Sequence, residues 1–93
     1  MENIITKEKI DKYFDLTSKA LEIVKENIIV SKEEEAKEII EMVSNYLSDA
    51  KHFFDKGDYV NAFGALNYAH GWIDSGVRLK VFDVEDNKLF TIR

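Results

Sequence analysis

Apolar residues along this chain recur mostly at spacings of three and four, which is the period of one face of an α-helix. A first stripe lies between about residues 6 and 29 and consists of Ile10, Tyr13, Phe14, Thr17, Leu21, Val24 and Ile28. A second lies between about 32 and 56 and consists of Ala36, Ile39, Ile40, Val43, Tyr46, Leu47, Ala50, Phe53 and Phe54. A third lies between about 59 and 80 and consists of Tyr59, Ala62, Phe63, Leu66, Ala69, Ile73 and Val77. Three helices are therefore predicted.

Short polar side chains mark the predicted helix starts. Thr6 can accept a hydrogen bond from a free backbone amide of the first turn. Ser31 and Glu34 have the spacing of a capping box, in which each side chain satisfies the other's backbone amide. Gly57 tolerates the left-handed conformation that ends a helix, and Asp58 can cap the next helix directly. Because this corner is so short, the second and third helices are predicted to be antiparallel neighbours.

Together these signals predict one all-α domain over 1–93. We expect an antiparallel three-helix up-down-up bundle with helices at about 6–29, 32–56 and 59–80. The remaining segment, 81–93, is predicted to be a short extended C-terminal tail, which could lie along the bundle or pair with a partner.

The third helix carries little charge, which is limited to Asp74, Arg78 and Lys80. The core stripe of this helix occupies only one of its sides. A helix that is apolar nearly all round is buried on more than one side, so the tail or a second subunit is expected to cover the rest. The residues of this second side and of a neighbouring strip of small residues are Gly64, Ala65, Tyr68, Gly71, Trp72, Ser75 and Leu79.

Glycine inside a helix costs about 1 kcal/mol relative to alanine. Gly64 and Gly71 therefore indicate a close approach by another helix, the tail or a bound molecule, and close helix packing is the simplest of these. From this pattern we predict a homo-oligomer, a dimer, or a complex with a protein partner. The predicted interface consists of Gly64, Tyr68, Gly71, Trp72, Ser75 and Leu79.

A polar flank descends the same helix through Asn67, His70, Asp74 and Arg78. Asp74 is one turn from both His70 and Arg78, so it could orient the histidine and pair with the arginine. Three interpretations stay open: a binding site for a small anionic ligand or nucleotide, a general base held by a carboxylate, or a structural network at the edge of the core. Since no nucleophile is placed beside His70 by the sequence, we assign no catalytic residues and do not expect an enzyme.

Composition narrows the classes further. The chain has two histidines and no cysteine, whereas zinc requires about four N or S ligands, so neither a metal nor another cofactor is expected. The charge balance of 13 Lys plus Arg against 18 Asp plus Glu makes nucleic-acid binding an unfavoured function. Apolar runs are far shorter than the ~20 residues of a membrane helix, so we expect a cytoplasmic protein without a membrane partner.

About a third of the chain, within residues 46–78, resembles the archaeal domain of unknown function family 357. The resemblance is carried by YLSDAKHF at 46–53, KGDY at 56–59, AF at 62–63, NYAHGWID at 67–74 and GVR at 76–78. It implies a short helical domain from an archaeon, and it implies no activity because none is assigned to the family. The hallmark run, NYAHGW, falls on the third helix.

A more distant similarity involves KGDY at 56–59 followed by Ala62, a phrase that also occurs in helical-hairpin repeats and in HEPN nucleotide-binding or ribonuclease families. One hairpin is not a repeat array, which requires about three units to bury its core. The HEPN ribonuclease motif has an arginine shortly before a histidine, and neither Arg78 nor Arg93 precedes one. The leading hypothesis is therefore a non-enzymatic module that self-associates through the third helix.

Overall fold

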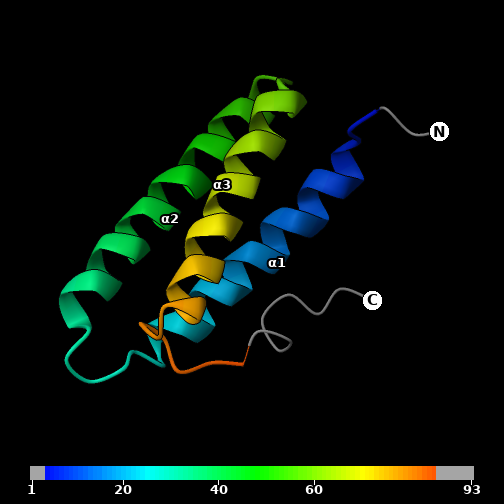
Figure 1. Cartoon of the computed structure of the whole chain (residues 1–93). Coiled ribbons are helices and arrows are strands. Elements are labelled where there is room, and N and C mark those ends of the chain that lie inside the picture. The colour runs from blue at the N-terminus through cyan, green and yellow to red at the C-terminus, as the bar shows by residue number, and fades with distance from the viewer. Residues whose placement is uncertain (1–3, 86–93) are drawn as a thin grey trace.

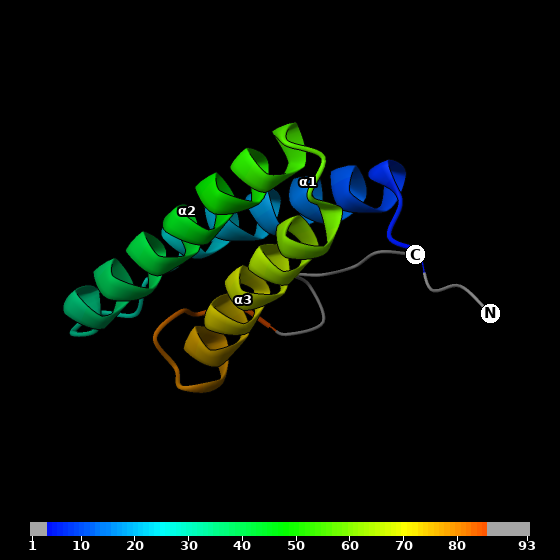
Figure 2. The same ribbon diagram turned by 90° about the horizontal axis from the view of Figure 1, so that it is seen from above.

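A computed structural model describes residues 4–85, and most of them form three helices (Figure 1). Helix α1 spans Lys7–Lys25, α2 spans Glu33–Asp55 and α3 spans Tyr59–Arg78. The predicted all-α fold with three helices is confirmed. Two perpendicular views agree that α3 lies in front of the seam between α1 and α2 (Figures 1 and 2).

Aromatic contacts between the helices fix their relative directions. Tyr46 stacks on Tyr68 with ring centroids 5.3 Å apart, and Phe54 stacks on Tyr59 at 5.4 Å. Positions later in α2 thus contact positions earlier in α3, so these two helices are antiparallel. The colours of Figure 1 show α1 running in the direction of α3, which gives the up-down-up order.

The core is shared by all three helices and by the segment that follows α3. It consists of Ile10, Ala20, Leu21, Val24, Ala36, Ile39, Val43, Leu47, Ala50, Ala62, Ala65, Leu66, Ala69, Ile73, Val77, Val81 and Phe82. The predicted core stripes supply most of these residues. Ala65 differs from its prediction: it was assigned to the second side of the third helix, yet it is buried where α3 meets α2.

Two of the predicted caps are present. The Thr6 side chain accepts a hydrogen bond from the backbone N–H of Lys9 at 3.1 Å, and the Asp58 carboxylate accepts one from the N–H of Asn61 at 3.2 Å. Gly57 has φ +79°, the left-handed conformation predicted for the corner between α2 and α3. The chain therefore reverses direction within a few residues, which places α3 against α2.

The predicted capping box at the start of α2 is wrong. Ser31 has φ +79°, whereas an N-cap residue requires an extended backbone to direct its side chain at the first turn. Lys32 occupies the N-cap position and makes no side-chain cap. The carboxylate of Glu33, rather than that of Glu34, accepts a hydrogen bond from the N–H of Ser31 at 3.2 Å.

Helix α1 is shorter than its apolar stripe predicted. It ends at Lys25, with Glu26 as its C-cap, rather than at about residue 29. Ile28 still packs against the core, but it does so from an extended segment that forms an isolated antiparallel bridge with Phe82. Burial thus continues beyond the end of the helix, and the apolar spacing could not separate the two.

Helix α3 ends at Arg78 in a Schellman motif, two residues before the predicted end. The N–H of Val81 donates to the carbonyl of Gly76 at 2.9 Å, and the N–H of Lys80 donates to that of Val77 at 3.1 Å. Lys80 occupies the left-handed position with φ +63°. This turn sends the chain back across the last turn of α3.

The returning segment ties α3 to the loop after α1. The N–H of Ile29 donates to the carbonyl of Val81 at 2.9 Å, and the N–H of Asp83 donates to that of Asn27 at 2.7 Å. Phe82 between them is only 1% exposed. We call residues 81–83, with their bonds to 27–29, the C-terminal clamp. The rest of the predicted tail, 86–93, lies outside the described residues.

Candidate functional site

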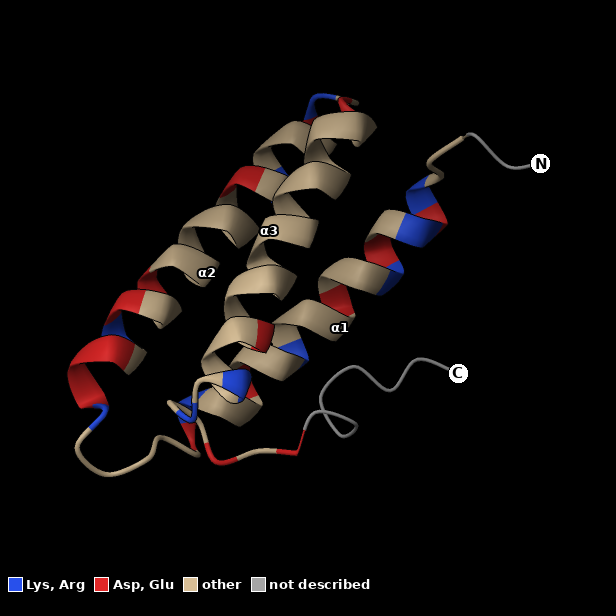
Figure 3. Cartoon of the chain, viewed as in Figure 1, with Lys and Arg blue, Asp and Glu red and all other residues tan. Residues whose placement is uncertain are grey.

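One side of α3 lies outside the core stripe and borders α2 along one edge, and we call it the outer face. Its residues are Val60, Gly64, Tyr68, Gly71, Trp72, Ser75 and Leu79. Three large side chains stand out into solvent: Val60 is 71% exposed, Tyr68 64% and Leu79 72%. In Figure 3, α3 is free of charged residues over most of its length, whereas α1 carries them along its whole length and α2 carries them towards both ends.

Tyr68 is held in place on the outer face by α2. Its ring stacks on that of Tyr46, with an interplanar angle of 20°. A shallow depression of about 190 Å³ lies on the α2 side and is lined by Tyr46, Asp49, Phe53, Asn61, Gly64, Ala65 and Tyr68. A second, of about 330 Å³, is lined by Asn67, Tyr68, Gly71, Trp72 and Ser75. Tyr68 thus forms a ridge between two hollows.

The two glycines of the outer face are uncovered within the described part of the chain. A Cβ built on Gly64 or on Gly71 would meet nothing within 4 Å. The close approach predicted for these glycines is therefore not made by residues 4–85. Gly76 is the glycine that receives a close neighbour, because a Cβ there would lie 2.6 Å from the ring of Phe82.

Trp72 is less exposed to solvent than Tyr68 and Leu79 on the same face. The sequence placed it beside Tyr68 as a large aromatic residue on an outward side, but it is half-buried and packs against the core. Val60 and Tyr46 were not among the predicted interface residues. Val60 could have been found, because it is an apolar residue that falls outside the core stripe.

The predicted polar flank comes together only in part. Arg78 Nε donates to Asp74 Oδ2 at 3.0 Å, as the spacing of one turn predicts. Burial lowers the pKa of His70 below its ordinary value, and the nearby Asp74 carboxylate offsets part of that fall. Asn67 is exposed and lines the second hollow of the outer face.

This geometry limits what the flank can do with an anion. The positive charge of Arg78 is paired with the negative charge of Asp74. Burial lowers the pKa of His70, so this side chain stays neutral down to a lower pH than an exposed histidine. A neutral imidazole beside a carboxylate could accept a proton, but the sequence placed no nucleophile next to it. On this flank Arg78 and Asp74 thus form an ion pair, Asn67 is exposed, and His70 is partly buried.

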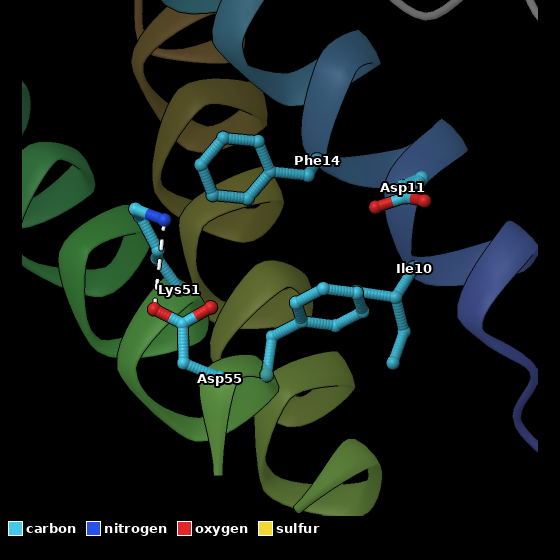
Figure 4. Close-up of a pocket in the computed structure, with 6 residues that line it drawn as sticks. Ile10, Asp11, Phe14, Lys51 and Asp55 are labelled. Atoms are coloured by element: carbon cyan, nitrogen blue, oxygen red, sulfur yellow. Dashed lines mark ion pairs between the residues drawn. The ribbon is translucent and has the colours of Figure 1, made fainter. Parts of the chain in front are cut away.

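A pocket that the sequence did not predict lies at the seam between α1 and α2 (Figure 4). It has a volume of about 180 Å³ and is lined by Ile10, Asp11, Phe14, Lys51, Phe54 and Asp55. Lys51 Nζ pairs with Asp55 Oδ2 at 3.5 Å, so these two charges neutralise each other. Mainly apolar walls remain, which is the character of an incompletely filled seam between two helices.

The chain matches the family described as "Protein of unknown function (DUF357)" over residues 12–82. The chain belongs to this family. The match covers all of α2 and α3, most of α1 and the C-terminal clamp up to Phe82. It confirms the family to which the sequence was assigned by resemblance.

Beyond DUF357 membership the comparisons give no further relative. Neither the comparison with curated proteins nor that with solved structures gave a match. Among residues 4–85, none of the helices combines the length and the apolar character needed to cross a bilayer.

Proposed function

We propose that this DUF357 protein is a non-enzymatic interaction module that self-associates, as a dimer, through the outer face of α3. One observation carries the proposal. Val60, Tyr68 and Leu79 are each well over half exposed on a helix face that also holds two uncovered glycines. Exposed apolar residues that are scattered singly need no explanation, whereas these three share one helix face with two glycines, so that a single partner helix could cover them together.

The cost of the two glycines strengthens this interpretation. Each is less favourable than alanine by about 1 kcal/mol in a helix interior, and within residues 4–85 no group needs the space that it leaves. A second backbone approaching α3 would need that space. Gly64 and Gly71 therefore fit a helix that packs closely against a partner.

The expected affinity is modest. Complete burial of a valine or leucine side chain is worth about 1.5–3 kcal/mol. Since Val60 is 71% and Leu79 72% exposed in the monomer, these residues from two copies together supply about 4–9 kcal/mol. Association costs about 4–15 kcal/mol in lost freedom of motion. These terms are of similar size, so the tyrosine pair of Tyr46 and Tyr68 has to supply the surplus. We expect a dimer whose population depends on protein concentration in the micromolar range.

Binding of a small anion or nucleotide through Asn67, His70, Asp74 and Arg78 is the alternative. It has less support, because Asp74 already neutralises Arg78 and burial disfavours the charged form of His70. An anion that bound there would remain attached in native mass spectrometry and would leave on denaturation. Arg78→Ala should then lose it while staying folded.

The proposal is tested by measuring the mass of the native protein between about 1 and 300 µM, a range that brackets a micromolar dissociation constant. We expect a concentration-dependent dimer for the wild type and a monomer for Tyr68→Glu. Val30→Glu is the matched control, because Val30 is 82% exposed in the loop before α2, outside the outer face. A wild type that is monomeric at the highest concentration would refute the proposal.

The position of the test substitution follows from burial. Trp72→Glu would place a charge against the core, so dissociation and unfolding could not be separated. Tyr68 is largely exposed, so Tyr68→Glu leaves the core intact. Circular dichroism at 222 nm should show the same helicity for Tyr68→Glu, Val30→Glu and the wild type.

A further inference from the structure

The side chains of the outer face are arranged symmetrically about the peptide bond between Ala69 and His70. Equally far on either side of that point stand three pairs: Val60 with Leu79, Gly64 with Ser75, and Tyr68 with Gly71. Trp72, the remaining residue of the outer face, has the polar Asn67 of the neighbouring flank as its counterpart. Even spacing about a central point is common to any helix face. The sizes of the paired side chains are specific to the outer face. Its end positions pair two apolar residues, the next positions pair two small residues, and the large Tyr68 is paired with a glycine.

Such a pattern is what an antiparallel pair of identical helices requires. In a two-fold symmetric interface, residue i of one copy contacts residue j of the other, and j contacts i in return. When two antiparallel helices lie side by side, residues equally far on either side of the axis come to the same level. A face that is symmetric in this sense is complementary to a second copy of itself.

We propose that two copies pair through α3 in antiparallel orientation, with the two-fold axis beside the Ala69–His70 peptide. This inference rests on the proposed self-association and adds its orientation and register. In this arrangement Tyr68 lies at the level of the partner's Gly71, and Val60 lies at the level of the partner's Leu79. Gly64 comes to the level of the partner's Ser75, so small residues meet and the two backbones can approach closely.

The helix dipoles favour this orientation over a parallel one. In an antiparallel pair the positive end of each α3 lies beside the negative end of the other, whereas a parallel pair would place like ends together.

Cysteine cross-linking tests the register directly, since the natural chain has no cysteine and each variant carries a single thiol. In the proposed dimer, two copies of residue 60 are about 28 Å apart along the axis at about 1.5 Å per residue, whereas residue 60 is level with the partner's residue 79. A short bismaleimide that cannot span 28 Å is therefore applied to Val60→Cys alone, to Leu79→Cys alone, and to their mixture. Val30→Cys reports cross-linking by random collision.

We expect a cross-linked dimer in the mixture and none in either single variant or in Val30→Cys. Cross-linking of Val60→Cys to itself would show a parallel pair and would overturn the inference while leaving self-association intact. Dimers by native mass spectrometry with no cross-link in the mixture would likewise overturn the register alone. Monomers for the wild type and for every variant would overturn the proposed function together with the inference.

Discussion

Two glycines of the same helix are expected to respond in opposite directions to substitution by alanine. Gly71 lies on the outer face, where an added Cβ meets nothing within 4 Å. Gly76 faces the C-terminal clamp, where an added Cβ would lie 2.6 and 2.8 Å from two ring carbons of Phe82 and 3.1 Å from Cδ1 of Ile39. Both substitutions gain the same helix propensity, so their difference measures the contact with Phe82.

For Gly71→Ala we expect the free energy of unfolding to rise by about 1 kcal/mol, which is the propensity difference between alanine and glycine in a helix. In a domain of this size that corresponds to a rise of about 4–8 °C in Tm. For Gly76→Ala the same gain is offset by overpacking, which typically costs about 1–3 kcal/mol. Subtracting the propensity gain of about 1 kcal/mol leaves a net loss of about 0–2 kcal/mol. Because Phe82 is only 1% exposed and its ring has little room to move, we expect a loss of about 1–2 kcal/mol, in the upper half of this range.

Thermal and urea unfolding followed at 222 nm measure both effects. The protein should be kept at low concentration, because association raises the apparent stability of the folded state. A Gly76→Ala variant as stable as the wild type would refute the packing argument for Phe82. A Gly71→Ala variant that is destabilised as a monomer would show that a group covers the outer face within one chain.

Two further predictions concern single side chains. Asp58→Ala should lower the free energy of unfolding by about 1 kcal/mol, because the carboxylate accepts from the backbone N–H of Asn61 at 3.2 Å and from its Nδ2 at 2.7 Å. Urea unfolding of Asp58→Ala and Asp58→Asn measures this loss. Equal stability of the wild type and Asp58→Ala would contradict the prediction. Burial lowers the pKa of His70, so the unfolded state binds a proton at higher pH than the folded state. The stability that depends on this residue is therefore fully present above about pH 6.5 and is lost as pH falls through the folded pKa. His70→Gln should lose less stability than the wild type between about pH 7.5 and pH 5, and His52→Gln is the control for removing a histidine. If the free energy of unfolding of His70→Gln falls with pH as steeply as that of the wild type, burial is not the cause.

The helices were predictable because their signals are local. Apolar spacing, the Thr6 cap and the Gly57 corner each depend on residues within one or two turns. The boundaries at the end of α1 and the start of α2 depend on distant residues instead. Ile28 lies beyond the end of α1 in a bridge with the distant Phe82, and Ser31 takes a left-handed backbone in the connecting loop. The sequence near Ile28 and Ser31 contains no signal that predicts either feature.

The candidate site was predictable as a charge-poor side of the third helix, but not in its details. Helical spacing alone placed Tyr68 and Trp72 side by side as equals. Packing makes them differ in exposure, because Tyr68 stacks on Tyr46 at the surface while Trp72 is partly buried against the core. The depth of a side chain at the edge of a stripe depends on how closely the neighbouring helix approaches, and this distance is not encoded in the spacing of one helix.

The C-terminal clamp has a consequence for the order in which the chain folds. α2 and α3 are joined by a short corner and share more contacts with each other than either shares with α1, so their hairpin closes a small loop and can form early. The bridge between Ile28 and Phe82 closes a loop that contains that whole hairpin. Since Phe82 follows all three helices, a chain emerging from the ribosome cannot complete its core until α3 and the clamp behind it have been synthesised. We therefore expect the nascent chain to hold a formed α2–α3 hairpin with α1 still undocked, and to lock α1 in place as its last folding step.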